Sequence, residues 1–122
     1  MRTSIFAISV VVLVTTSALP ALAGNFKRIK SAEEFTALVV GKKIEWDGGT
    51  AMIHANGKTD GKLKKQGKYA GNWVFSKGFY CRNLVINKKE TGTNCQTVEI
   101  DGNSMRLTRD QGKGQSTVLS LK

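Results

Sequence analysis

Apolar and polar residues alternate from Lys43 to the end of the chain in short stretches separated by turn residues. Such a pattern is typical of an antiparallel meander. The predicted strands are 43–46, 50–55, 58–63, 68–75, 79–86, 94–100, 104–109 and 116–121. In a domain this small, so many strands are not expected to form a flat open sheet, so the sheet should close or fold into two layers. The sequence therefore predicts a mainly β fold, an antiparallel meander closing into a small barrel or sandwich.

One short helix is predicted before the strands, at about 32–40. Ser31 and Glu34 have the spacing of a capping box, in which the Ser31 hydroxyl accepts the Glu34 amide and the Glu34 carboxylate returns to the Ser31 amide. Gly41 can end the helix in a left-handed conformation. Three apolar side chains share one face, which we expect to pack on the sheet: Phe35, Leu38 and Val39.

Residues 1–23 have the pattern of a signal peptide. Arg2 supplies a basic start, 5–19 is an apolar run interrupted by hydroxyl residues, and 21–23 is a small-x-small cleavage site. Cleavage after Ala23 would leave one small β domain, 24–122, in the periplasm or outside the cell, with no transmembrane segment. A retained membrane anchor is the alternative, but the apolar run is shorter than the roughly 20 residues that span a bilayer.

The chain is strongly basic. It has 19 Lys and Arg against 9 Asp and Glu, and only Arg2 lies in the predicted leader, so the mature segment has 18 basic residues and a formal charge of +9. Such a charge attracts an anionic ligand or an acidic component of the cell envelope. The other interpretation is that the lysines only keep the surface solvated. The oligomeric state is left open.

Two cysteines, Cys81 and Cys95, are expected to pair in an oxidising compartment. They flank a predicted hairpin of 79–86 and 94–100 with a turn at 87–93, and both are equidistant from Lys88. We therefore predict a structural disulfide across the hairpin, which would add about 3 kcal/mol to the free energy of unfolding. A redox pair is the alternative, although the chain has no C-x-x-C spacing.

The densest basic segment is a candidate anion-binding site. Its members are Lys58, Lys62, Lys64, Lys65 and Lys68. Alternate residues of a strand share a face, so Lys58, Lys62 and Lys64 could project together. Lysines of this kind also protect an edge strand from aggregation, and the sequence favours that interpretation. Aromatic residues do not alternate with them, which argues against sequence-specific nucleic-acid binding.

The hairpin register defines a candidate pocket. With Cys81 opposite Cys95, Tyr80 faces Gln96, and Arg82 shares their side of the sheet with several apolar residues. If this side points inward, Tyr80, Arg82 and Gln96 become polar groups in a mostly apolar interior, as in ligand pockets. If the disulfide points inward, Arg82 lies on the surface. We expect Arg82 to serve structure by holding neighbouring carbonyls.

Catalytic groups are sparse. His54 is the only histidine, and a lone strand histidine is more often a surface or packing residue than a general base. The sequence contains no hydrolase triad order, clustered metal ligands, P-loop or dinucleotide fingerprint. We therefore predict no catalytic residues, no metal and no cofactor, and leave enzymatic activity an open but disfavoured alternative.

Several segments resemble a group of small secreted alphaproteobacterial proteins. The segments are Phe26-Lys27-Arg28-Ile29, Glu34-Phe35, Gly71-Asn72-Trp73, Gly78-Phe79-Tyr80-Cys81-Arg82, Asn94-Cys95-Gln96-Thr97-Val98 and 106–114. The resemblance implies export and a disulfide. Members of the group are sometimes labelled dihydrodipicolinate reductase, but this chain lacks a dinucleotide fingerprint and is too small for separate cofactor and substrate domains.

Together these features predict an exported, non-enzymatic binding or accessory module for an anionic or amphipathic partner. The alternative is a small disulfide-bridged inhibitor or an envelope-stress protein. A hydrolase or oxidoreductase is disfavoured by the missing triad, metal ligands and cofactor motif.

Overall fold

A computed structural model describes residues 24–122 of the chain; the predicted signal peptide, 1–23, lies outside the described residues. The elements in chain order are β1 (Lys27–Ile29), α1 (Ala32–Leu38), β2 (Lys43–Trp46), β3 (Gly49–Ile53), β4 (Lys58–Leu63), β5 (Gly67–Ser76), β6 (Phe79–Ile86), β7 (Lys89–Asp101), β8 (Ser104–Thr108), α2 (Arg109–Gly112) and β9 (Ser116–Leu121). Within this part of the chain, no helix has the length and apolar character needed to cross a membrane.

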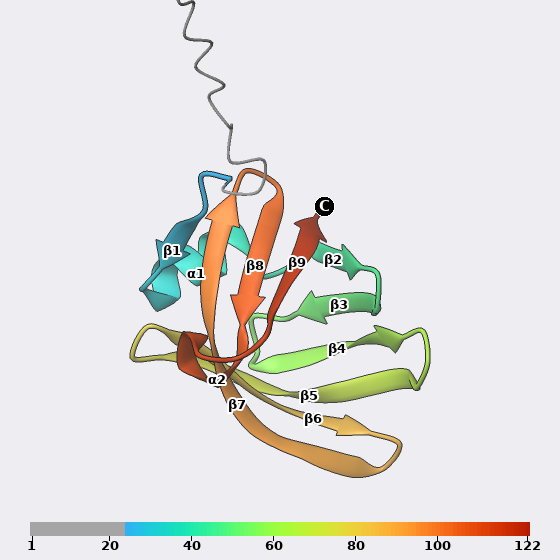
Figure 1. The fold of residues 1–122 in the computed structure, drawn as a ribbon. Coiled ribbons are helices and arrows are strands. Elements are labelled where there is room, and N and C mark those ends of the chain that lie inside the picture. The colour runs from blue at the N-terminus through green and yellow to red at the C-terminus, as the bar shows by residue number, and fades with distance from the viewer. Residues whose placement is uncertain (1–23) are drawn as a thin grey trace, which may run out of the picture.

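The strands from β2 to β9 form a closed eight-stranded antiparallel barrel (Figure 1). Neighbours in sequence pair with each other, and β9 closes the barrel by pairing with β2, with Leu121 opposite Ile44. The long strand β7 pairs with β6 through its first half and with β8 through its second half. β1 lies against that second half on its other side. This confirms the predicted mainly β fold and identifies it as a barrel.

Helix α1 closes one end of the barrel. Phe35 is fully buried there, and its ring centroid lies 5.1 Å from that of Phe75, 5.2 Å from Tyr80 and 5.3 Å from Trp73. The Trp73 indole also donates to the His54 carbonyl at 2.8 Å. Aromatic contacts at these separations add to the burial of the rings. This end of the barrel is therefore filled by side chains.

The helix prediction is partly confirmed. The Ser31 hydroxyl accepts the Glu34 amide at 3.2 Å, and Gly41 is left-handed with φ 82°. The helix ends at Leu38, two residues earlier than expected. Leu38 is 38% exposed, so only Phe35 and Val39 of the predicted apolar face are buried.

The β6–β7 connection is tighter than predicted. The turn consists of Asn87 and Lys88, both with positive φ, as in the hairpin turns that follow the right-handed twist of strands. A β-bulge follows, in which Thr91 and Gly92 together lie opposite Leu84. The Thr91 hydroxyl accepts a hydrogen bond from the Leu84 amide at 3.2 Å. The extra residue of the bulge restores the predicted register.

The disulfide between Cys81 and Cys95 is present, and the two residues are direct cross-strand partners. The predicted turn at 87–93 is longer than the observed one, because the hydrophilic residues 89–93 have the composition of a loop. They continue β7, where one edge of the strand is exposed and tolerates them.

We predict that Phe35→Ala lowers the free energy of unfolding by about 3–5 kcal/mol, because it removes the ring on which three other aromatic side chains pack. The measurement is urea denaturation followed by tryptophan fluorescence. Leu38→Ala, in the same helix, is the control and should cost less than about 1 kcal/mol. Equal losses in the two variants would contradict this role for Phe35.

Candidate ligand cavity

The barrel interior is hollow on the side away from α1. A cavity of about 330 Å³ lies there, and most of its wall is apolar. The apolar lining comes from strands all around the barrel and includes Ile44, Trp46, Ala51, Ile53, Leu63, Leu84, Ile86, Met105, Leu107 and Leu119. The volume lies in the range of sites that bind small molecules.

Three side chains from the hairpin of β6 and β7 point into this cavity: Tyr80, Arg82 and Gln96. Tyr80 is the direct partner of Gln96, and Arg82 is the partner of Asn94, as the predicted register requires. The sequence left open which face of the hairpin turns inward. The structure places these polar residues inside and the disulfide on the outer face of the same strands.

Gln96 is buried with 3% of its surface exposed, and its side-chain amide makes no hydrogen bond with another residue in 24–122. Within these residues, the side-chain polar atom that is fully enclosed without a partner is Asn83 Oδ1, so the Gln96 amide is open to the cavity rather than sealed in the protein. Since Gln96 lines the cavity, a bound molecule or water could supply the missing partner.

Arg82 makes no hydrogen bond or ion pair with any other described residue. The expectation that it holds neighbouring carbonyls is therefore wrong. Burial lowers the pKa of its guanidinium, and the positive charge of Arg109 lowers this pKa further. Arg109 also lines the cavity, and none of the described residues of the lining is Asp or Glu. The cavity wall thus carries the half-buried guanidinium of Arg82 and the exposed guanidinium of Arg109, with no carboxylate among its lining residues.

A short helical segment, α2, positions Arg109. The Asp110 amide donates to the Asn94 side-chain oxygen at 3.2 Å, and the Asn94 amide donates to the Asp110 carboxylate at 2.7 Å. Asp110 and Gln111 have positive φ, a conformation that costs a non-glycine residue free energy. Sequence reasoning missed Arg109, although its place two residues after Leu107 continues the inward face of β8.

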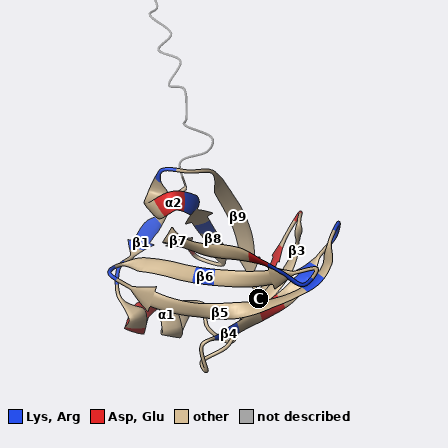
Figure 2. Ribbon diagram, turned by 90° about the horizontal axis from the view of Figure 1, so that it is seen from below, with Lys and Arg blue, Asp and Glu red and all other residues tan. Residues whose placement is uncertain are grey.

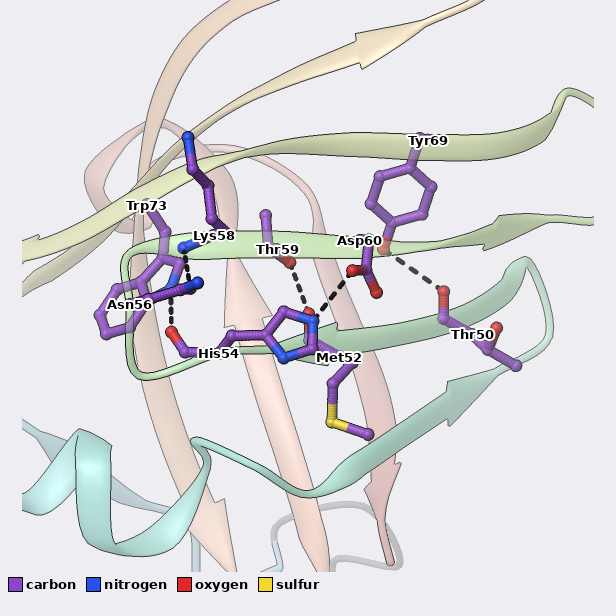
Figure 3. A network of polar contacts seen from close by, with 9 residues as sticks. All are labelled: Thr50, Met52, His54, Asn56, Lys58, Thr59, Asp60, Tyr69 and Trp73. Atoms are coloured by element: carbon purple, nitrogen blue, oxygen red, sulfur yellow. Dashed lines mark hydrogen bonds and ion pairs between the residues drawn. The ribbon is translucent and has the colours of Figure 1, made fainter.

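Hydroxyl groups elsewhere in the cavity wall are bonded to backbone carbonyls (Figure 3). Tyr69 donates to the carbonyl of Thr50 at 3.3 Å, and Thr59 donates to that of Met52 at 2.9 Å. These bonds join β4 and β5 to β3. The groups left for a ligand consequently include Arg82, Arg109 and Gln96, and the hydroxyls of Tyr80 and Thr117 also lie on the cavity wall.

His54 lies outside the cavity lining. Its Nε2 atom is 2.9 Å from a carboxylate oxygen of Asp60 on the barrel surface (Figure 3). Within residues 24–122, no group of three or more His, Cys, Asp and Glu side chains has the arrangement of a metal site.

The five predicted anion-binding lysines divide into two places. Lys58 donates to Asn72 at 2.7 Å, at the start of β4. Lys62, Lys64, Lys65 and Lys68 lie at the other end of this hairpin, all exposed. β4 lies between β3 and β5, and β5 between β4 and β6. Neither strand is an edge, so the interpretation of these lysines as edge protection is wrong.

A comparison of the chain with protein-family models, curated proteins and solved structures found no match. The resemblance to small secreted alphaproteobacterial proteins therefore stays a prediction.

Burial raises the pKa of the Tyr80 phenol to about 12 and moves that of Tyr69 in the same direction. These are the two tyrosines of the chain. Because an unfolded tyrosine has a pKa of about 10, stability is intact below pH 10 and falls as the pH rises toward 12. We predict no phenolate absorbance at pH 10 in ultraviolet titration. A full phenolate signal at that pH from folded protein would contradict the buried placement.

Proposed function

We propose that this protein is a non-enzymatic binding protein that holds a small amphipathic anion inside its barrel. The acidic head of the ligand accepts hydrogen bonds from Arg82, with Arg109 and Gln96 beside it. The apolar part of the ligand lies against the aliphatic wall. A fatty acid or another carboxylate with a hydrocarbon tail has this chemistry.

The observation that carries the proposal is the pair of cavity-lining arginines with no carboxylate among the lining residues. An arginine stays protonated at neutral pH, so it cannot relieve its burial by losing a proton. Arg82 is half-buried and has no acidic partner among the described residues, so its charge beside an apolar cavity is unfavourable until an anion compensates it; Arg109 is exposed and adds a second positive charge at the cavity wall. Charge-assisted hydrogen bonds from guanidinium to carboxylate are among the strongest available in proteins.

The predicted export and the disulfide support the periplasm, or the outside of the cell, as the place where binding occurs. A cavity closed at one end by α1 and lined mostly by apolar side chains suits a ligand whose tail is held and whose head is near the charged residues. The proposal requires no metal, cofactor or catalytic group.

Octanoate and octanol test the role of the charge, because they share a hydrocarbon chain and differ in the head group. We expect Arg82→Met to weaken octanoate binding by about 10- to 100-fold, the equivalent of one charged hydrogen bond, and to leave octanol binding nearly unchanged. Isothermal titration calorimetry gives both dissociation constants.

Arg106→Met is the matched control, since Arg106 is paired with Glu99 at 2.6 Å and does not line the cavity. It should bind octanoate as the unchanged protein does. The proposed role of Arg82 as counter-ion would be refuted if Arg82→Met weakened octanoate binding and octanol binding equally. It would also be refuted if Arg106→Met weakened octanoate binding as much as Arg82→Met does.

Arg82→Met should also raise the stability of the ligand-free protein, because methionine fills the same space without a desolvated charge. The expected result is a higher midpoint of urea unfolding, together with the loss of octanoate binding. A lower midpoint would mean that Arg82 supports the fold rather than a ligand.

A further inference from the structure

The β4–β5 and β6–β7 turns follow strands that line the cavity. Leu63, the last residue of β4, and Ile86, the last residue of β6, are both lining residues. The β4–β5 and β6–β7 turns come directly after them. β5 pairs with both β4 and β6, with Lys62 opposite Lys68 and Tyr69 opposite Ile86. The two turns therefore lie beside each other at the end of the barrel away from α1.

These turns and the strand ends next to them carry six exposed lysines, which we call the mouth lysines: Lys62, Lys64, Lys65, Lys68, Lys88 and Lys89. Figure 2 shows this basic end of the molecule, beyond β5 and β6. No ion pair within residues 24–122 involves any of them. The acidic residues nearby in sequence are fewer: Asp47, Asp60 and Glu90.

The mutual repulsion of the mouth lysines destabilises the protein, and this indicates that an anionic partner binds them. Lys62 and Lys68 are direct cross-strand neighbours, and like charges in that position are destabilising. Asp60, two residues from Lys62, is already paired with His54. An anionic surface outside the molecule would relieve the repulsion among the mouth lysines.

We propose that the mouth lysines bind the surface of an anionic phospholipid membrane, with the cavity opening turned toward the lipid. The headgroup phosphates neutralise the lysines, and the opening faces a source of amphipathic anions. The uptake of amphipathic anions from the membrane rests on the proposed function of the cavity, whereas membrane binding by the mouth lysines does not.

The cavity favours a membrane over a nucleic acid as the partner. The lysines lie on two neighbouring turns next to strands that line an apolar cavity, and not along a continuous groove. The aromatic side chains in residues 24–122 are buried or half-buried and none is fully exposed, unlike the stacking platforms of single-strand binding proteins. Binding to a polyanion without binding to vesicles is thus an outcome that would overturn the proposal.

The experiment is cosedimentation of the purified protein with vesicles of equal parts phosphatidylglycerol and phosphatidylcholine, and with vesicles of phosphatidylcholine alone. We expect binding only to the anionic vesicles, with loss at high salt. Each lysine near an anionic surface contributes about fivefold to partitioning, so Lys65→Gln with Lys88→Gln should weaken binding about 25-fold.

Lys30→Gln with Lys77→Gln is the control, because it removes the same charge at the end of the barrel near α1. It should reduce vesicle binding by less than about threefold, since these lysines would face away from the lipid. Equal losses in the two double variants would show attraction by net charge alone and overturn the proposal, as would absence of binding to anionic vesicles at low salt.

Arg82→Met separates this proposal from the proposed function. It should bind anionic vesicles like the unchanged protein while losing octanoate. Loss of vesicle binding in this variant would place the membrane contact in the cavity and contradict a role for the mouth lysines.

Discussion

The contact of Phe35 with the aromatic side chains inside the barrel determines how the interior is divided. Helix α1 inserts this ring between Trp73, Phe75 and Tyr80, so one end is filled to the level of Tyr80. Beyond that level Trp46 and Tyr69 lie along the wall, and a cavity of about 330 Å³ stays open. The fold thus combines a packed half, which stabilises the protein, with a hollow half. The hollow half carries polar and charged side chains whose burial lowers the free energy of unfolding.

Those groups are concentrated on the short β6–β7 hairpin and the segment beside it. Arg82 and Gln96 come from paired strands, and Arg109 comes from α2, which Asn94 attaches to β7. One contiguous piece of structure therefore places these three donors together on the cavity wall. The opposite wall uses its hydroxyls to bind its own backbone, so a ligand would meet donors on one side and hydrocarbon on the other.

Most strands were predictable because alternation and turn residues act locally; β2, β4, β6 and β9 have the expected bounds. β1 was missed because three residues are too few to show a period. The cavity residues Tyr80, Arg82 and Gln96 were predicted together, since the cysteines defined their register. Their inward direction was not predictable, because it depends on how the whole sheet curves. Arg109 was not predicted as a cavity residue, because the glycine-rich segment that follows it has the pattern of a simple turn.

The disulfide lies outside the cavity, yet it determines the contents of the cavity. Side chains alternate across a strand, so a slip of β7 by one residue against β6 would turn Gln96 outward and Cys95 inward. A covalent bond can join the two cysteines only when they share a face. Oxidation of Cys81 and Cys95 therefore excludes the neighbouring alignments, and the chemical identity of the interior becomes dependent on the redox state of the compartment that holds the protein.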